Sequence, residues 1–411
     1  MNKTMNTKVL RTPDEVAKRQ GMWLTIVALV ILYAVLFALD NFVKPNKFTL
    51  MLIPVLRKGA IYSLLCVSMN LLNGFTGLFS LGQAGFILIG AYAYSIFSIP
   101  AAAHASVYQY FDGGAIQFSI PEMLGNAIGV NAGSFFGAII CIIIAGLAAA
   151  VFAALIGLPV LRLKSDYLAI ATLGFAEILR AFFQWKGLGV ITNSSNLLRK
   201  YTAFSDMKLQ IGSQVFKLST TFPFLIAMIS IIIIVLLINS SYGRAFKAIR
   251  DDEVAAEAMG INLAKHKMIS FVVSSFFAGV SGATMAMVLS IAQANNYKVA
   301  MTYEILLMVV LGGIGSISGS VIGSLLFVAT SEWWLRGLDS GKFLGIDAPG
   351  VFRNGFRLVV FSIGIPCAIS GIVGNLLGSH FALKKGAKFI RPMMLVVLVL
   401  LLGKIVSDAV L

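Results

Sequence analysis

The sequence contains few charged residues. Asp, Glu, Lys and Arg make up 12% of the 411 residues, about half the share of roughly 25% found in an average soluble domain. Hydrophobic residues make up 58%. A water-exposed surface cannot be built from so few charges, so most of the chain must face lipid or other apolar helices. The composition therefore excludes an ordinary soluble enzyme.

Residues that could carry out covalent chemistry are also scarce. The three cysteines lie inside apolar stretches, and the three histidines are scattered without metal-ligand spacing. The sequence has no G-x-x-x-x-G-K-[ST] phosphate loop, no G-x-S-x-G elbow and no H-E-x-x-H motif. We therefore expect no catalytic residues, no metal site and no ATP hydrolysis by this chain, and a membrane enzyme lacks a convergent set of residues.

Acidic residues are outnumbered, with 17 Asp and Glu against 32 Lys and Arg, a net charge of +15. In a membrane protein such an excess lies in short loops and sets orientation, so nucleic-acid binding is not expected. The tail 1–21 and the segment 241–267 each contain five Lys and Arg. Both are predicted to be cytoplasmic, with polar loops at 100–130 and 185–221 on the outer face.

Long uncharged runs divide the chain into membrane-crossing segments. No Asp, Glu, Lys or Arg occurs between Lys58 and Asp112, a run of 53 residues, whereas one helix needs about 20 to cross a bilayer. We predict an all-α polytopic membrane protein with about 9–10 spans. Apolar segments are expected at 22–39, 59–73, 84–99, 133–158, 168–184, 222–239, 268–291, 305–331, 356–375 and 393–410, with 305–331 entering and leaving on one side.

Two glycine-rich segments, 74–82 and 312–319, interrupt these runs, one in each half of the chain. Three positions share their spacing: Gly74, Gly77 and Ser80 in the first segment, and Gly312, Gly315 and Ser318 in the second. Related halves with interrupted helices near the substrate path are typical of transporters. Close helix packing through small residues is the alternative. We predict two broken or re-entrant elements in related halves.

The charged segment 241–267 is predicted to contain a short helix. Asp251 and Asp252 favour a helix N-terminus, good helix formers follow, and Gly260 is a natural stop. A helix of about two turns is too short to be stable alone in water. The segment suits either docking on a cytoplasmic protein partner or an ordinary solvated loop. Its charged side chains include Arg244, Lys247, Arg250, Glu253 and Glu257.

One pair of opposite charges lies inside a predicted span. Glu177 and Arg180 are three residues apart, on one helical face. Charges within a membrane are costly and often functional, but a pair at this spacing can also be purely structural. Both interpretations stay open.

Four stretches resemble the LivM-type permease subunit of branched-chain amino-acid ABC transporters, in the LivH/LivM family. They occur in the family's order, and with the spans between them the likeness covers about 50–375. The stretches are SMNLLNGFTGLFSLGQAGFILIGAYA (68–93), LRLKSDYLAIATLGFAEILR (161–180), GRAFKAIRDDEVAAEAMGIN (243–262) and YEILLMVVLGGIGSISGSVIGSLL (303–326).

The resemblance implies an importer for Leu, Ile and Val in the bacterial cytoplasmic (inner) membrane. It implies two ATP-binding subunits, which hold the ATP and Mg, a second, LivH-like permease subunit and an extracytoplasmic solute-binding protein. The ATPase-docking segment, proposed around Arg244 and Arg250, matches the family's docking loop at Glu253, Ala255, Ala256, Glu257 and Gly260. The substrate-path candidates are Gly77, Ser80, Gly82, Gln83, Gly312, Gly315 and Ser318.

The resulting division is a cytoplasmic tail at 1–21, a transmembrane permease domain at 22–375 and an atypical extension with an extra apolar span at 376–411. This extension faintly resembles the C-terminal end of TauE/SafE-type exporters and departs from the family. Gln83 also departs from it, because family members commonly have His there. Alternative functions are the same importer type for another amino acid, urea or an amide, and an ion-coupled secondary transporter.

Overall fold

The computed structural model describes residues 29–42, 47–163, 165–211 and 214–334, together with two short strands beyond them. Residues through Trp333 form one compact unit and those from Trp334 another. The second unit contributes the antiparallel strands β3 (Lys342–Phe343) and β4 (Ile346–Asp347). The expected spans at 356–375 and 393–410, the tail 1–21 and the extension 376–411 lie outside the described residues.

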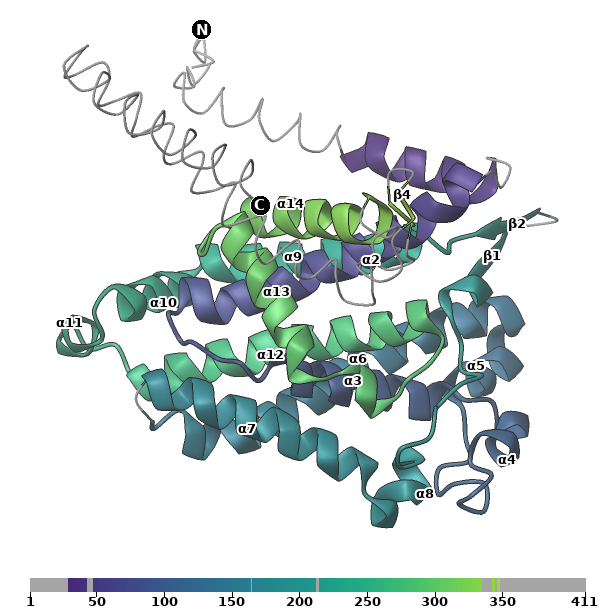
Figure 1. Ribbon diagram of the computed structural model, residues 1–411, viewed down its shortest axis with the longest axis horizontal. Helices are drawn as coiled ribbons and strands as arrows, with labels where there is room; N and C mark the ends of the chain where they lie inside the picture. The colour runs from purple at the N-terminus through teal and green to yellow at the C-terminus, as the bar shows by residue number, and fades with distance from the viewer. Residues whose placement is uncertain are drawn as a thin grey trace, which may run out of the picture. The chain divides into compact units, whose positions relative to one another are not determined.

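The first unit is almost entirely helical (Figure 1). Its longer elements are the helix Leu29–Asn41, α2 (Lys47–Asn70), α3 (Gln83–Ser98), α6 (Val130–Val160), α7 (Ser165–Gln184), α9 (Thr221–Asn239), α10 (Ser241–Asp251), α12 (Leu263–Leu289), α13 (Val299–Gly312) and α14 (Ile317–Ala329). Its shorter elements are α4 (His104–Val107), α5 (Ile120–Ile128), α8 (Gly189–Thr192), α11 (Glu253–Ala258), the hairpin β1 (Lys208–Ile211)–β2 (Gln214–Lys217) and the single turns η1 (Leu71–Phe75), η2 (Ala101–Ala103), η3 (Lys186–Leu188), η4 (Phe204–Asp206), η5 (Ala294–Asn296) and η6 (Thr330–Trp334).

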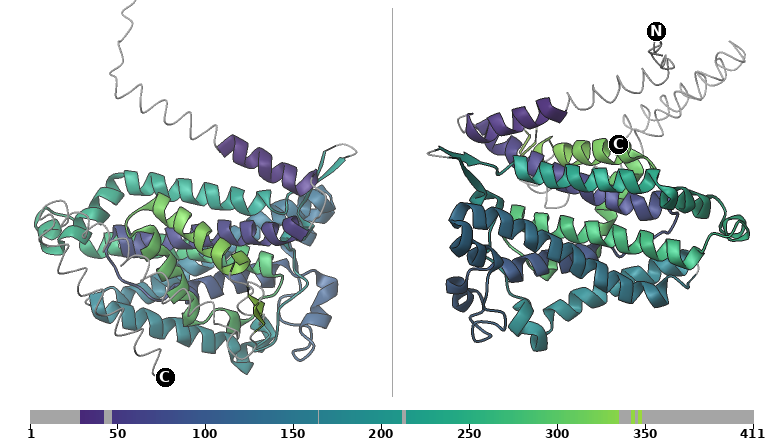
Figure 2. Two further views of the ribbon diagram at one scale, coloured as in Figure 1. Left: turned by 45° about the horizontal axis from the view of Figure 1, so that its top comes forward. Right: turned by 180° about the vertical axis from the view of Figure 1, so that it is seen from behind.

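Helix α12 forms the centre of this unit. It packs against α6 on one side and α3 on another, and also against α2. In its most apolar stretch 72% of the residues are buried, more than in the other four helices that are long and apolar enough to cross a membrane. Helices α9 and α14 pack on α2, and α7 packs on α3. The two views in Figure 2 show the same helices from other sides.

Small residues bring these helices close together. A Cβ added at Gly90 of α3 would lie 2.1 Å from the carbonyl oxygen of Gly279 on α12, and one at Gly282 would lie 2.1 Å from that of Ile87. Because a side chain fits at neither position, α3 and α12 can pack backbone to backbone. These contacts fix α3 against the central helix.

Five helices of the described residues are long and apolar enough to cross a membrane, or six if the bent pair Gln83–Ser98 and Ala101–Val107 counts as one span. Leu29–Asn41 and Ile317–Glu332 are shorter apolar helices. The all-helical, multi-pass architecture is thus confirmed, with fewer candidate spans in this part than the sequence suggested. One reason is that the segment 305–331 is divided between α13 and α14, and each of these helices is too short to cross a membrane.

Two expectations about element boundaries are wrong. The helix expected at 59–73 begins earlier, at Lys47. Arg57 and Lys58 can lie inside this helix because each has a partner in another part of the chain. Arg57 donates to the Ser219 hydroxyl at 2.6 Å, and Lys58 pairs with Glu332 at 2.8 Å. The loops expected at 100–130 and 185–221 contain α5 and the β1–β2 hairpin, so they are partly regular structure.

The two ends of the long helices differ. Figure 1 shows α10 and α11 at one end, and α4, α5, α8 and the β1–β2 hairpin at the other. The charged segment 241–267 is therefore separated from the loops at 100–130 and 185–221 by the length of the helices.

Candidate functional site

The first glycine-rich segment interrupts the helical run between α2 and α3. Helix α2 continues as the π-helical turn η1, the chain then has no regular structure over 76–82, and α3 begins at Gln83. Gly77 has φ = +75°, a conformation that residues with a Cβ adopt at a cost. The side-chain amide of Asn73 fixes the segment by pairing with the backbone N–H and C=O of Ser80, at 3.2 and 3.3 Å.

Polar groups of this first break are held by neighbouring protein groups. The buried Gln83 donates from Nε2 to the Ser68 hydroxyl at 2.9 Å. Ser80 is buried as well, and a Cβ on Gly82 would lie 3.0 Å from the carbonyl oxygen of Thr172 on α7. Among the substrate-path candidates here, only Gly77 is exposed.

The second glycine-rich segment separates α13 from α14. Gly315 has φ = +81°, and Ser316 caps α14 by accepting a hydrogen bond from the Gly319 N–H at 3.1 Å. A Cβ on Gly312 would lie 2.2 Å from the Gly319 carbonyl oxygen, so Gly312 allows α13 and α14 to touch. The alternative of close packing thus describes the contact made by Gly312, while Ser318 is exposed.

The two breaks meet each other. Asn70, the last residue of α2, accepts from the Gly315 N–H at 2.8 Å and donates to the Ser316 carbonyl at 3.0 Å and to the Ser320 hydroxyl at 2.7 Å. A Cβ on Gly74 would lie 2.6 Å from the Gly315 nitrogen. The side chain of Asn70 therefore joins two segments some 245 residues apart in the sequence.

Helix α11 lies within the charged segment 241–267. Asp252 caps it by accepting from the Val254 and Ala255 N–H groups at 2.8 and 3.0 Å, and Gly260 ends it with φ = +84°. The short helix predicted after Asp252 is present, and α10 extends the helical part of the segment. Glu253 pairs with Lys267 at the start of α12, at 2.6 Å.

The outer surface of α11 combines charged and apolar side chains. Val254 and Met259 are 78% and 84% exposed. Ala255 and Glu257 are exposed beside them, whereas Ala256 faces inward and is buried. An exposed apolar pair on a helix tip is typical of a surface that another protein covers.

Arg250, at the end of α10, connects this segment to the breaks. Its Nη1 donates to the Gly74 carbonyl at 3.3 Å, while Nε and Nη2 donate to Asp251 at 3.0 and 2.8 Å. A Cβ on Gly77 would lie 2.9 Å from Arg250 Cγ, and one on Gly315 would lie 3.4 Å from its Nη1. Lys247, one turn earlier, lies 5.9 Å from the ring centre of Phe75. The charged segment 241–267 and both breaks are thus in direct contact.

The sequence placed Arg250 on the docking surface with Arg244, and the structure separates the two. Arg244 is exposed and contacts Ser241 of its own helix at 3.4 Å, whereas Arg250 reaches the breaks. Sequence reasoning also missed Asn70. Its signal is an amide side chain within the uncharged run 59–111, four residues before the glycine-rich segment 74–82.

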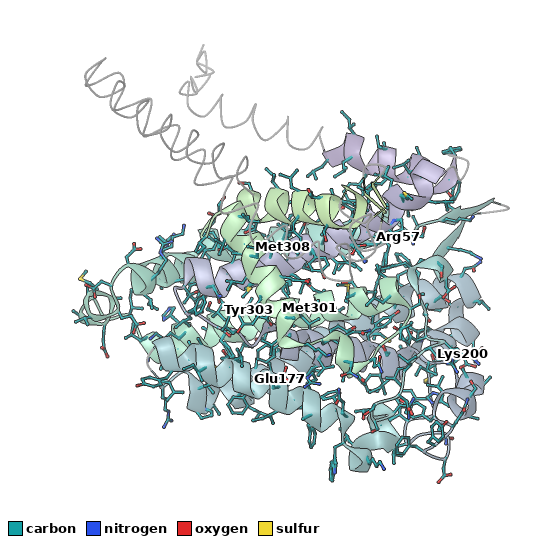
Figure 3. All side chains as sticks on the ribbon, in the orientation of Figure 1. Arg57, Glu177, Lys200, Met301, Tyr303 and Met308 are labelled. Carbon is teal, nitrogen blue, oxygen red and sulfur yellow. The ribbon has the colours of Figure 1, made fainter. Side chains whose placement is uncertain are left out.

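The pair Glu177–Arg180 is internal to α7. Arg180 Nη2 lies 2.6 Å from Glu177 Oε2, and 24% of the Arg180 side chain and 36% of the Glu177 side chain are exposed. Figure 3 labels Glu177 on α7. No three His, Cys, Asp or Glu side chains gather as a metal site requires within the described part of the chain.

Several apolar crossing helices and a charged segment at one of their ends define a multi-pass membrane protein. Residues 51–363 match the family described as branched-chain amino acid transport system, permease component. The chain belongs to this family, which confirms the resemblance found in the sequence.

Three relatives illustrate the similarity. The chain is 29% identical over 292 residues to the high-affinity branched-chain amino acid transport system permease protein LivM of Escherichia coli, covering 66% of this chain and 61% of that protein. It is 24% identical over 277 residues to a probable LivM of Methanocaldococcus jannaschii, covering 65% and 76%. It is 25% identical over 215 residues to a probable LivH of the same organism, covering 50% and 64%. No solved structure matches the chain at comparable significance.

The chain spans about three fifths of the length of its enterobacterial relatives, 61% for the Escherichia coli and Salmonella typhimurium LivM proteins.

Proposed function

We propose that this chain is a transmembrane permease subunit of an ABC importer that translocates Leu, Ile and Val. Family membership and the names of the relatives support the substrate class. In this proposal a solute-binding protein delivers substrate outside the membrane, two separate ATP-binding subunits hold ATP and Mg, and a LivH-like permease completes the pathway. The chain lies in the bacterial cytoplasmic membrane with the tail 1–21 and segment 241–267 inside.

The observation that carries the proposal is the exposed tip of α11 in contact, through Arg250, with both breaks. Val254 and Met259 offer an ATPase subunit an apolar patch, and the capped N-terminus keeps it helical. A lone carrier has no need of such a docking surface. The pair Glu177–Arg180 does not favour the ion-coupled alternative, because each charge already has its partner.

Movement of α11 reaches the breaks along a short route. When ATP binding draws α11 toward the ATPase, α10 and Arg250 move with it. The hydrogen bond from Arg250 to the Gly74 carbonyl then changes the position of the first break, and Asn70 passes the change to Gly315 and Ser316. Alternating access requires two such discrete arrangements of the helices.

In this proposal the breaks are the moving, re-entrant parts of two related halves. Gly77 and Gly315, which have the same place in the sequence repeat, both have positive φ and both approach Arg250. Polar backbone outside regular helices is stable at membrane depth only where protein or water satisfies it. Gly82, Gln83 and Ser80 support the first break from within the protein, and Gly77 remains the best candidate to face the path.

Co-purification tests docking directly. The tagged chain is expressed with its native genetic neighbours, extracted in mild detergent and analysed for subunits. We expect a stoichiometric ATPase subunit with the wild type and its loss in the double variant Val254→Asp, Met259→Asp. Tyr110→Asp is the matched control, because Tyr110 is 77% exposed at the opposite end. Equal recovery of the ATPase with all three proteins would contradict the docking role of α11.

A further inference from the structure

A cleft of about 290 Å³ lies between α2, the end of α12, the segment 290–298 and the start of α13. Its size is near the lower end of the range for small-molecule sites, which begins at about 300 Å³. Met301 lines the cleft. Figure 3 labels this residue near the middle of the long helices. The cleft is distinct from the two breaks, since none of its lining residues belongs to either.

Charges of both signs line this cleft. Lys58 contributes from α2, Lys298 from the residue before α13 and Glu304 from the second turn of α13. Lys58 already pairs with Glu332 at 2.8 Å, whereas Lys298 is exposed and makes no ion pair with the residues that the structure describes. Charged groups among apolar spans are costly and usually mark a functional site.

The start of α13 adds donors that favour an anion. The first N–H groups of a helix have no acceptor within it, and its dipole is positive at this end. Tyr297, two residues before α13, lines the same cleft. Its side chain is 2% exposed, and its hydroxyl has no hydrogen-bond partner among the described residues. A buried phenol hydroxyl without an acceptor can donate a hydrogen bond to a ligand in the cleft.

The remainder of the lining is apolar and adaptable. Met285 and Leu289 come from the last turns of α12 and Met301 from the first turn of α13. Methionine side chains fit branched aliphatic groups of different shapes because they are unbranched and flexible. The cleft thus has a donor-rich part, a carboxylate and an apolar wall within one small volume.

We propose that this cleft binds a free aliphatic amino acid as a zwitterion. The carboxylate is held by Lys298, the start of α13 and the Tyr297 hydroxyl, the ammonium group by Glu304, and the aliphatic side chain by Met285, Leu289 and Met301. Half-helices that begin at membrane depth bind substrate carboxylates in this manner in other transporters. The assignment rests on the proposed function and locates a substrate site within it.

Protection of an introduced thiol tests the site even when binding is weak. Ala300 is exposed in the cleft, and Ala300→Cys is labelled with a maleimide in the co-purified complex in nanodiscs. Labelling of the wild-type complex gives the background from the native cysteines, which is subtracted. L-Leucine is expected to slow labelling in a saturable way. Leucinol, which lacks the carboxylate, and 4-methylpentanoate, which lacks the ammonium, are expected to need at least tenfold higher concentrations.

Variants that remove a charge or a hydroxyl group show which residues bind the carboxylate and which bind the ammonium group of the ligand. In the Ala300→Cys background, Lys298→Gln and Tyr297→Phe should each raise the half-protecting leucine concentration severalfold and leave the value for leucinol unchanged. Glu304→Gln should raise it for leucine and leave it unchanged for 4-methylpentanoate. Lys186→Gln, at an exposed lysine outside the cleft, is the control. Equal labelling rates without ligand show that each variant is folded.

Two results would overturn the assignment. One is an absence of protection by leucine, and the other is equal protection by leucine, leucinol and 4-methylpentanoate. ATP-driven leucine uptake is measured in parallel with the same complex reconstituted into proteoliposomes. This measurement separates failure of the cleft assignment from failure of the proposed function. If uptake persists while protection is absent, the importer proposal stands and its substrate binds elsewhere.

Discussion

Among the described residues, Arg250 is the side chain of segment 241–267 that contacts the first break by a hydrogen bond. It donates to the Gly74 carbonyl and to Asp251 at the same time. An arginine side chain can do this because its guanidinium group presents several donors in a fixed planar arrangement, which lysine lacks. Because Arg250 lies at the end of α10 and directly before α11, a movement of α11 would displace it.

Replacement of Arg250 by Ala is expected to uncouple the importer without disassembling it. The ATPase subunit should still co-purify, because Val254 and Met259 are unchanged, but ATP-driven uptake should fall at least tenfold while ATP hydrolysis continues. Arg250→Lys should restore part of the uptake. Lys265→Ala, at an exposed cation of the same segment, serves as control. Uptake at the wild-type level in Arg250→Ala would refute the coupling route.

Glycines with positive φ allow backbone strain and steric clash to be separated. A Cβ at Gly260 would meet nothing within 4 Å, whereas one at Gly77 would meet Arg250 at 2.9 Å. Gly260→Ala should therefore cost about 1–2 kcal/mol for the backbone conformation alone. Gly77→Ala should cost more, with a larger fall in Tm in detergent. Gly174→Ala, in a helix with open space around it, should be neutral or stabilising. Equal Tm values for the first two variants would show that the contact with Arg250 is easily relieved.

Helix α11 depends on its cap, because six residues make too few hydrogen bonds to sustain a helix alone. Asp252→Ala should destabilise α11 by about 1 kcal/mol and speed hydrogen exchange at the Val254 and Ala255 amides. Recovery of the ATPase subunit should fall with it. Asp252→Asn keeps an acceptor and should behave like the wild type. Unchanged exchange in Asp252→Ala would mean that α12 holds α11 in place without the cap.

Elements set by local patterns were predictable from the sequence, and those set by distant contacts were not. Apolar length predicted α6 and α9 to within a few residues, and the Asp252–Gly260 pattern predicted α11. The start of α2 was missed because Arg57 and Lys58 find partners at Ser219 and Glu332, more than 160 residues away.

The candidate site was predictable in its parts and not in their assembly. Repeated glycine spacing predicted both breaks, and the pattern of the charged segment predicted the short helix α11. Nothing in the linear pattern brings Asn70 to Gly315 or Arg250 to Gly74, because each contact joins segments that helix packing alone places together. Neither contact has a counterpart in local spacing.

The distribution of charge across the molecule predicts which end of the helices faces the cytoplasm. Lys265 lies in the positively charged segment beside α11, and Lys186 lies beyond the far end of α7. Lys265→Cys should react with a membrane-impermeant maleimide only after the cells are opened, and Lys186→Cys should react in intact spheroplasts. The reverse pattern would invert the topology and place α11 out of reach of a cytoplasmic ATPase.

ATP-driven uptake in proteoliposomes tests the central claim most directly. The chain is purified with its native neighbours and reconstituted into proteoliposomes that contain ATP and Mg. The solute-binding protein is added outside, and the uptake of labelled leucine is measured. The importer proposal predicts accumulation that requires internal ATP and disappears in the double variant Val254→Asp, Met259→Asp. Accumulation by the chain alone, driven by an ion gradient and indifferent to ATP and to changes in α11, would contradict it.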